Sequence, residues 1–480
     1  MTASGSVPYS PAAWSYYIAF LVFAGYFILL TLYYIFLAGV GFIEGKKRFR
    51  ESEDEIYHLL SASIFSLPVS IIIPARNEEN WIADSVRSVL RLNYPEFEVI
   101  IVDDGSSDAT LQALDGVLSL KGYDKTYVKK YHDGQVREIF KSDVYPNVTV
   151  ISKYSGYKKA GAVNAGLNLA RYKYICVIDA DTILEPDILM KVMAQVHRNP
   201  EHVIGVGSYF GISNGLGVKD GVIIDRNFSY NPISAYQNLE YIRSFIGNRI
   251  AWSKFNAMPN VAGGFGLWRR DIVHELGGYD TEFTCEDIEY TFRAHDYAVK
   301  NKKKGYRIVM LPYIAGWTEG PARVSSLILQ RNRWQRVINE TIWKYKYMIL
   351  NPRFGSFGFL TLPYFVIYEV FGVFVEAISI ATLGVGAFLG FFRPEVFFAF
   401  FCLMFLSGAL ISILSLFAFI RIQKVFKFRY ILYLLGLSFL EYFGYRWLIV
   451  FAKISGTFSY FRRDREYTMY AREKRAPSRE

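Results

Sequence analysis

The sequence predicts an α/β domain with a mixed, mostly parallel sheet, embedded between transmembrane α-helices. Short, almost wholly apolar strands alternate with amphipathic helices from residue 69 onward, which favours parallel strands covered on both faces. Long charge-free stretches lie before and after that region. Hydrophobic residues make up 52% of the chain and aromatic residues 17%, above the usual content of a soluble domain.

A transmembrane helix is expected near the amino terminus. Residues 14–43 contain no charged side chain, and about 20 apolar residues suffice to cross a hydrocarbon core. The stretch lacks the basic start and short apolar core of a cleaved signal. Basic residues follow it directly at Lys46, Lys47, Arg48 and Arg50. By the positive-inside rule, we expect a multi-pass protein of the cell membrane whose α/β domain is cytoplasmic.

Further transmembrane segments are predicted after residue 355. Residues 396–420 are free of charge, and residues 430–452 are apolar except for Glu441 and Arg446. Both stretches are long enough to cross a membrane. Charged side chains within such segments face protein or a water-filled path.

The stretch from residue 355 to residue 392 has two interpretations. It is either an interfacial helix followed by one crossing over 362–391, which contains Glu369 and Glu376, or two short crossings. One crossing places the basic tail outside, against the positive-inside rule, and two crossings keep it in the cytoplasm. The sequence leaves both open.

The strands of the α/β domain end in polar residues. Apolar strands are expected at 69–73, 99–102, 148–152 and 174–178. Ligands bind beyond the carboxyl ends of such strands. The polar residues that follow three of these strands are Arg76, Asn77, Asp103, Asp104, Asp179 and Asp181.

Asp179 and Asp181 are candidate metal ligands. Their i, i+2 spacing at the end of an extended strand points both carboxylates to one side. Two such acids suit a hard divalent cation that bridges to a diphosphate. The alternative is a solvated turn or a helix cap.

Two further segments offer candidate binding residues. Lys158 and Lys159 lie near a helix start beside glycines, where a lysine can meet a phosphate or can be a plain surface charge. Gly263, Gly264 and Gly266 allow close backbone approach by a bulky group, or form a tight turn that enters a helix at Arg270.

Acidic residues cluster at Glu286, Asp287 and Glu289. A carboxylate there is a candidate catalytic base. The alternative is a helix amino terminus, where negative charge is favoured for electrostatic reasons.

Gln330, Arg333 and Trp334 combine an amide, a bidentate phosphate donor and a large flat ring. An amphipathic helix at the bilayer surface would explain the same residues, and both interpretations can hold together.

Composition excludes several classes of function. The three cysteines are scattered, and the six histidines lack zinc-type spacing, so neither a disulfide framework nor a zinc site is implied. The net charge of +10 fits anionic lipids and phosphate-bearing substrates. Nucleic acid is not expected as a partner, because no basic stripe with interleaved aromatic residues is present.

Taken in order, these motifs resemble those of the membrane-embedded family 2 glycosyltransferases, which include cellulose, chitin, hyaluronan and poly-N-acetylglucosamine synthases. The matching stretches lie between residues 69 and 336 and read IIIPARNEEN, VIIVDDGSSD, KKAGAVNAG, VIDADT, NVAGGFGLWRRD, CEDIEYTFR, TEGP and QRNRW. Cellulose synthases have Thr where Cys285 stands here and a Cys-bearing loop at Ala262 to Gly264. The motif forms are thus closer to those of poly-N-acetylglucosamine synthase.

The resemblance implies a GT-A type domain and roles for particular residues. Asp103 and Asp104 would hold uridine, Lys159 would approach the diphosphate, Asp179 would contact the donor, and Asp181, with Asp179 beside it, would ligate Mg²⁺ or Mn²⁺. Asp287 would be the general base, with Glu286 beside it. The remaining implied substrate-binding residues are Ala75, Asn77, Glu78, Gly264, Gln330, Arg333 and Trp334.

The implied activity is inverting, metal-dependent transfer of a sugar from a UDP-sugar to a growing β-linked polysaccharide, coupled to export through the transmembrane helices. The main alternative is transfer of one sugar to a lipid, giving a glycolipid; a transporter with a regulatory domain is a weaker one. Export or accessory subunits are possible partners, and regulation by a cyclic dinucleotide is not expected.

The expected segments are 1–45 (transmembrane helix), 46–68 (connector), 69–338 (GT-A domain), 339–361 (interfacial helices), 362–452 (about three transmembrane helices) and 453–480 (basic tail).

Overall fold

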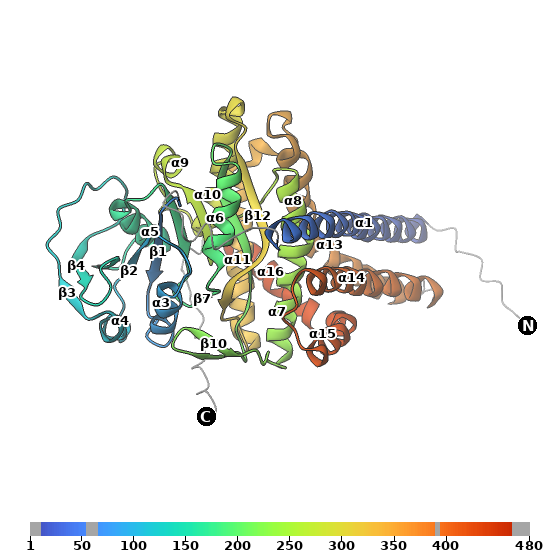
Figure 1. Ribbon diagram of the computed structural model, residues 1–480. Helices are drawn as coiled ribbons and strands as arrows, with labels where there is room; N and C mark the ends of the chain where they lie inside the picture. The colour runs from blue at the N-terminus through green and yellow to red at the C-terminus, as the bar shows by residue number, and fades with distance from the viewer. Residues whose placement is uncertain (1–10, 54–65, 389–393, 463–480) are drawn as a thin grey trace, which may run out of the picture.

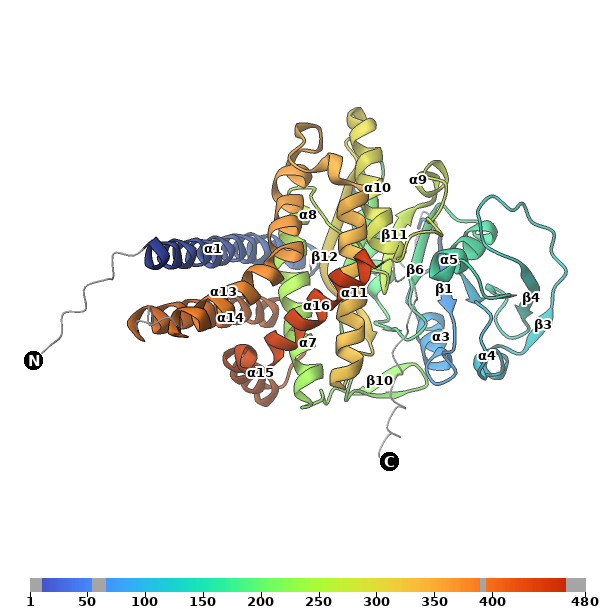
Figure 2. The ribbon, with the colours of Figure 1, turned by 180° about the vertical axis from the view of Figure 1, so that it is seen from behind.

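The computed structural model describes residues 11–53, 66–388 and 394–462. A sheet with helices on its faces lies on one side of the molecule, and long helices, including α1 (Pro11–Glu53) and α14 (Pro394–Ile422), project from the other (Figure 1). The same division is seen from behind (Figure 2).

The sheet is mixed, as predicted. Its ten strands run in the order β3-β4-β5-β2-β1-β6-β11-β8-β12-β7. The neighbours β5, β2, β1 and β6 are parallel, whereas the β3 and β7 edges are antiparallel. The strands are β1 (Val69–Ala75), β2 (Phe97–Asp103), β3 (Leu120–Gly122), β4 (Val136–Ser142), β5 (Val148–Lys153), β6 (Tyr174–Ile178), β7 (Ile183–Leu184), β8 (Val203–Ile212), β11 (Phe265–Arg269) and β12 (Arg307–Thr318).

The central strands are buried because helices cover both faces. Every residue of β1 and β6 is buried, as expected for near-continuous apolar strands in a parallel sheet. The carboxyl ends of β1, β2 and β6 therefore open at one edge. The covering helices are α3 (Ile82–Leu90), α4 (Thr110–Leu118), α5 (Lys158–Leu169), α6 (Ile188–Arg198), α9 (Arg270–Glu275) and α10 (Glu286–Lys300). A separate hairpin pairs β9 (Gly217–Lys219) with β10 (Val222–Asp225).

Strands β11 and β12 are among those that were not foreseen. A turn at Gly263 and Gly264 leads into β11, which lies antiparallel between β6 and β8, and the expected helix begins after this strand at Arg270. Strand β12 pairs in parallel with β8, and its register shifts around Leu311 and Ile314. Pro312 lies at that irregularity, in agreement with the tendency of proline to break regular pairing.

The long apolar helices are consistent with a membrane protein. Two helices, over Trp14–Glu51 and Phe398–Ile422, are long and apolar enough to cross a membrane, and the described residues hold up to four spans if each of two bent pairs is one span. The pairs bend by 43° between Phe357–Val370 and Gly372–Phe388, and by 56° between Phe428–Phe443 and Tyr445–Phe461. The basic tail lies outside the described residues.

The bent pairs contain short π and 3₁₀ segments. The first consists of η5 (Phe357–Thr361), α12 (Leu362–Tyr364), η6 (Phe365–Val370) and α13 (Gly372–Phe388), and the second of α15 (Phe428–Leu440), η7 (Glu441–Phe443) and α16 (Tyr445–Phe461). Three 3₁₀ turns complete the list: η2 (Lys302–Lys304), η3 (Lys346–Met348) and η4 (Pro352–Phe354).

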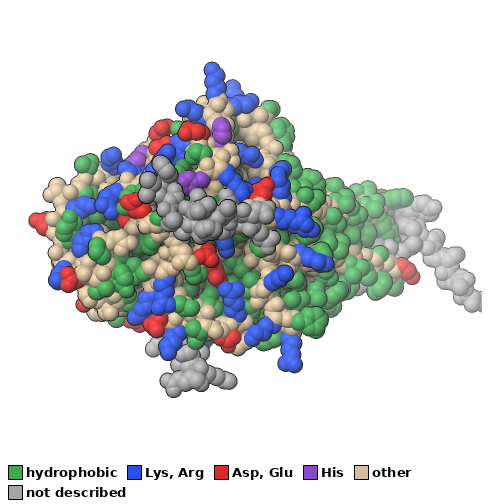
Figure 3. Space-filling view, viewed as in Figure 1, with side chains coloured by type: hydrophobic (Ala, Val, Ile, Leu, Met, Phe, Trp, Pro, Cys, Tyr) green, Lys and Arg blue, Asp and Glu red, His purple; other side chains and the backbone are tan. Residues whose placement is uncertain are grey.

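The surface divides in the same way as the fold. Hydrophobic side chains cover the part formed by the projecting helices, whereas charged side chains gather over the rest (Figure 3). On α1, the side chains of Leu21, Val22 and Leu29 are more than half exposed. Exposed apolar area of this extent fits contact with lipid.

Two helical segments join the sheet to the projecting helices. The first runs through α7 (Pro232–Ile242), the π segment η1 (Arg243–Arg249) and α8 (Ile250–Lys254), and η1 packs against α1 and α14. The second is α11 (Val324–Lys344), which packs along α16. Hydrogen bonds from Asn332 to Ser455 (3.0 Å) and from Asn339 to Thr457 (3.1 Å) tie α11 to α16.

The contact between α5 and β1 gives a stability prediction. A Cβ on Gly166 would lie 2.5 Å from Cγ2 of Ile72, whereas a Cβ on Gly116 of α4 meets nothing within 4 Å. We expect Gly166→Ala to destabilise the fold by about 1–3 kcal/mol through overpacking, and Gly116→Ala to stabilise it by roughly 0.4–1 kcal/mol. Thermal unfolding of the detergent-solubilised protein measures both. Equal effects of the two substitutions would contradict the packing argument.

Candidate active site

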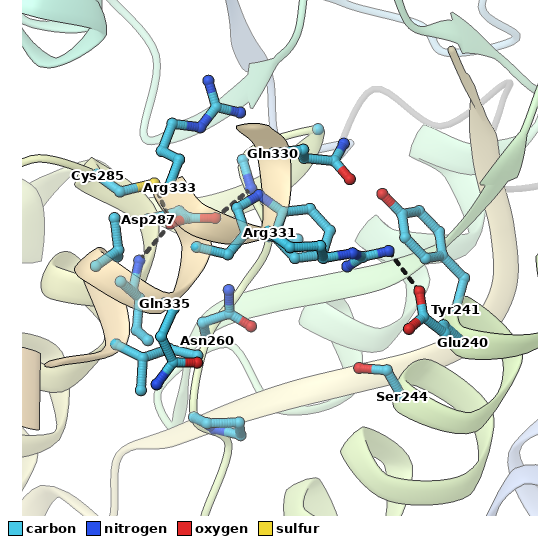
Figure 4. Close-up of a pocket in the computed structure, with 18 of the residues that line it drawn as sticks. Glu240, Tyr241, Ser244, Asn260, Cys285, Asp287, Gln330, Arg331, Arg333 and Gln335 are labelled. Carbon is cyan, nitrogen blue, oxygen red and sulfur yellow. Dashed lines mark hydrogen bonds and ion pairs between the residues drawn. The ribbon is translucent and has the colours of Figure 1, made fainter. Parts of the chain in front are cut away.

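A cavity of about 950 Å³ extends from the carboxyl edge of the sheet to the space between the projecting helices. With the exception of Asp103, it is lined by all the residues to which the resemblance assigns a role: Ala75, Asn77, Glu78, Asp104, Lys159, Asp179, Asp181, Gly264, Glu286, Asp287, Gln330, Arg333 and Trp334. Part of its lining is drawn in Figure 4.

Asp103 and Asp104 follow β2 but face different surroundings. Asp103 is buried outside the cavity lining and accepts hydrogen bonds from the backbone N–H of Ser106 (3.1 Å) and the hydroxyl of Ser152 (3.4 Å). Asp104 lines the cavity and pairs with the fully buried ammonium of Lys153. Burial raises the pKa of Asp104, and Lys153 opposes that shift. Asp104 is thus the one of the two that can meet a ligand directly.

The turn after β1 is held against the loop after β2. Asn77 has a left-handed backbone, with φ of 55°, and its Oδ1 accepts the N–H of Ser107 at 2.9 Å. The N–H of Glu78 donates to Thr110 Oγ1 at 2.8 Å. These contacts fix one wall of the cavity.

Asp179 and Asp181 both line the cavity just beyond β6. Asp181 Oδ2 accepts the hydroxyl of Thr318 at 3.2 Å, and Asp179 Oδ1 lies 2.6 Å from the ammonium of Lys159. Among residues 11–53, 66–388 and 394–462, no group of three His, Cys, Asp or Glu side chains is placed to hold a metal ion. A carboxylate pair still fits Mg²⁺, which is usually held by one or two carboxylates together with substrate phosphates.

Lys159 joins the donor-side carboxylates to the acidic cluster. Its Nζ lies 2.6 Å from Asp179 and 2.7 Å from Glu286. Burial opposes its charge, but the two carboxylates outweigh burial and raise the pKa of Lys159 well above its usual value. Burial also raises the pKa of Glu286, with Lys159 opposing and Asp287 adding to the shift. A Cβ on Gly263 would approach Lys159 Nζ to 2.7 Å, so this glycine leaves room for the lysine.

Asp287 lies at the start of α10 and is held by two segments. It accepts the N–H of Gly263 at 3.0 Å and the thiol of Cys285 at 3.1 Å (Figure 4). Glu289, in contrast, is fully buried outside the cavity lining, where it accepts the hydroxyl of Tyr345 and pairs with Arg293. Of the acidic cluster, only Glu286 and Asp287 can therefore reach a substrate.

Helix α11 brings Gln330, Arg333 and Trp334 to the cavity. Between them, Arg331 pairs with Glu240 of α7 and stacks over Trp334, with its guanidinium carbon 4.1 Å from the ring centroid. Figure 4 shows Arg331 directed toward Glu240 and Arg333 directed elsewhere. Arg331 was not predicted, although it stands inside the QRNRW motif.

The cavity continues between the projecting helices, where ion pairs line it. Glu369 pairs with Lys453 (2.6 Å), Glu376 with Arg446, and Glu441 with Arg243 (2.8 Å). Glu369, Glu376, Glu441 and Arg446 were expected to face protein or a polar path; they are paired and line the cavity. Sequence reasoning missed five lining residues because no local motif marks them: Glu240, Tyr241, Arg243, Arg249 and Lys453. The available signal was the presence of charged residues in the largely apolar segment 242–252.

The fold defines an α/β domain of the GT-A glycosyltransferase type set against apolar helices. The sequence model described as Glycosyl transferase family 2 matches residues 70–277, and the model described as Glycosyl transferase family group 2 matches residues 174–452. The second match covers more than half of the chain, so the protein belongs to the group 2 glycosyltransferases.

Relatives and solved structures agree with this membership. Poly-β-1,6-N-acetyl-D-glucosamine synthase from Staphylococcus epidermidis is 28% identical over 277 residues, which are 57% of this chain and 55% of the relative. The enzyme of the same name from Staphylococcus aureus is 26% identical over 275 residues. The chain thus spans about half the length of these relatives. The mannosyltransferase PcManGT from Pyrobaculum calidifontis has the same fold, with a TM-score of 0.53, 17% identity and coverage of 92% of this chain and 99% of that one.

The buried pair of Glu376 and Arg446 gives a second stability prediction. The Glu376 side chain is 2% exposed, so Glu376→Gln leaves an uncompensated guanidinium and should cost about 3–5 kcal/mol. Asp143→Asn, which breaks the exposed pair of Asp143 and Lys121, should cost less than about 1 kcal/mol. Chemical denaturation in detergent compares the two. A Glu376→Gln protein as stable as the parent would show that the ion pair is dispensable.

Proposed function

We propose that the protein is an inverting glycosyltransferase that transfers a sugar from a UDP-sugar to a growing β-linked polysaccharide and exports the product between its transmembrane helices. The observation that carries the proposal is the continuous cavity, which joins the carboxylates of the strand edge, Asp287, helix α11 and the projecting helices. Donor, acceptor and exit path would then share one space.

The comparisons support parts of this proposal. The relatives from Staphylococcus are named as synthases of a β-linked N-acetylglucosamine polymer. PcManGT was solved with GDP-Man and Mn²⁺, which supports a nucleotide-sugar donor and a divalent cation for this fold. The family membership argues against a transporter whose α/β domain is only regulatory.

The donor would bind at the sheet edge. Asp104 and Asn77 would contact the nucleoside from the loops after β2 and β1, with Asp103 supporting its loop from below. Lys159 and Arg333 would lie beside the diphosphate, where their charge stabilises the leaving group. Asp179 and Asp181 would hold Mg²⁺ or Mn²⁺, which when bound supplies further positive charge to the same diphosphate.

Asp287 would act as the general base. The acceptor hydroxyl oxygen forms a bond to the anomeric carbon from the face opposite the diphosphate, and its proton passes to a carboxylate oxygen of Asp287. The bond from the anomeric carbon to the diphosphate breaks, and its electron pair leaves with the nucleotide. The hydrogen bonds from Gly263 and Cys285 would keep the Asp287 carboxylate oriented for this step.

The acceptor would lie beyond Asp287, with the indole of Trp334 beside its sugar ring. A multi-pass arrangement with a cytoplasmic catalytic domain would give the donor access from the cytosol and the product a path across the membrane. Accessory subunits could assist export.

Product analysis tests the function. Purified protein is incubated with Mn²⁺ and a panel of UDP-sugars, with GDP-mannose as the alternative donor, and nucleotide release and product size are measured. A polymer ladder from a UDP-sugar is the expected result. A single glycolipid would favour transfer of one sugar to a lipid. Release from GDP-mannose alone would overturn the proposed donor, and no release from any donor would overturn the function.

Replacement of Asp287 tests the base. Asp287→Asn should lower the transfer rate by at least about a hundredfold, with UDP affinity changed less than about twofold, because the amide keeps the shape but cannot take the proton. Glu282→Gln, which neutralises an exposed carboxylate nearby, should keep parental activity. Radiolabelled-sugar transfer and UDP binding are measured on all three proteins. Substantial transfer by Asp287→Asn would remove Asp287 from this role.

A further inference from the structure

The charges at the membrane end of the cavity are almost all paired. This end is defined by the lining residues of α7, η1 and the helices after residue 357. It contains four glutamates, and each contacts its own cation. The pairs are Glu240 with Arg331, Glu369 with Lys453, Glu376 with Arg446 and Glu441 with Arg243.

Arg249 is the cation left over. It is the last residue of η1 and lines the cavity, yet its side chain makes no hydrogen bond or ion pair with any residue in 11–53, 66–388 and 394–462. Its guanidinium carbon lies 4.1 Å from the centroid of the Phe245 ring, and its Nε and Nη1 are covered by protein. Burial lowers the pKa of Arg249 to about 10, with the charge of Asp287 opposing, so the side chain is still protonated near neutral pH.

An arginine in this state suits a ligand with negative charge. Arg249 is partly buried, and N–H donors that are covered by protein without a carboxylate partner are costly. Bidentate contact with a carboxylate or phosphate group would satisfy these parallel donors. The cation–π contact with Phe245 holds the group in place but uses none of these donors.

The leaving diphosphate of the donor is not the natural partner. Its end of the cavity already has the cations Arg76, Lys158, Lys159 and Arg333. Arg249 belongs instead to the helical segment that packs against α1 and α14. Its charge interacts electrostatically with that of Asp287, the proposed base. Because Arg249 lines the same end of the cavity as the ion pairs between the helices, we place it on the acceptor side of the reacting centre.

We propose that the acceptor is an acidic saccharide, whose terminal sugar carries a carboxylate or phosphate group that binds Arg249. The inference rests on the proposed function and narrows its acceptor class. The walls around this end favour a sugar over a lipid tail, because tyrosine side chains, which combine an apolar ring with a polar hydroxyl, line it together with the ion pairs. These tyrosines are Tyr26, Tyr34, Tyr241, Tyr364, Tyr368 and Tyr442.

Direct binding tests the proposal independently of turnover. The probes are three β-linked disaccharides that differ only at C6 of the non-reducing sugar, which carries a carboxylate, a phosphate ester or a hydroxyl. Calorimetry with the full-length protein in detergent should show that at least one anionic probe binds about tenfold or more tightly than the neutral one. Which anionic probe binds more tightly distinguishes a uronic acid from a sugar phosphate.

Variants assign the preference to Arg249. Arg249→Met should abolish the difference in affinity between anionic and neutral probes and leave UDP affinity unchanged. Arg249→Lys should keep part of the preference for the anionic probes. Arg353→Met, which removes an exposed arginine on η4, should behave as the parent. Thermal unfolding verifies that each protein is folded.

Several outcomes would overturn the inference. These are equal binding of the three probes by the parent, a preference that survives Arg249→Met, a loss of UDP affinity in that variant, or tighter binding of a polyprenyl phosphate than of either acidic disaccharide. Nucleotide release measured on the same samples tests the proposed function separately. If no nucleotide is released but the acidic probes still bind in an Arg249-dependent manner, the proposed function is overturned and the inference about Arg249 is not.

Discussion

The contact of Lys159 with both Asp179 and Glu286 is the interaction on which the arrangement of the site depends. One carboxylate follows strand β6 and the other begins helix α10. A single ammonium group therefore joins the segment that would bind the donor to the segment that contains the proposed base. Without it, three acidic side chains would repel one another in a buried space, because Asp287 adjoins Glu286. The lysine thereby holds Asp179 close to the start of α10, and Gly263 provides the space that it needs.

Much of the sheet and its edge could be predicted from the sequence. Strands β1, β2, β5 and β6 are continuous apolar runs, and polar residues follow them directly, so convergence of Asn77, Asp104 and Asp179 is a property of parallel strands. Asp103 shows the limit of that reasoning, since of two adjacent carboxylates one faces the cavity and one supports a loop. Strand β12 was not foreseen, because it contains Pro312 and its pairing with β8 is set by residues about a hundred positions away.

The membrane end of the cavity could not be predicted in the same way. Helical periodicity locates apolar segments, but the partner of a charged residue on one helix depends on the crossing of another. Glu376 and Arg446 are 70 residues apart, and Arg243 and Glu441 are 198 apart. Arg249 is the extreme case, because what distinguishes it is the lack of a partner among the described residues, which only the assembled helices reveal.

The pairing of Arg331 with Glu240 affects how the molecule can move. Helix α11 is bound to α7 by this pair and to α16 by the bonds of Asn332 and Asn339, while Tyr445 of α16 donates a hydrogen bond to the same Glu240 at 2.9 Å. The Glu240 carboxylate of α7 thus contacts both α11 and α16. Separation of α7 from α11 and α16 therefore requires the release of Glu240 from both of its partners at once.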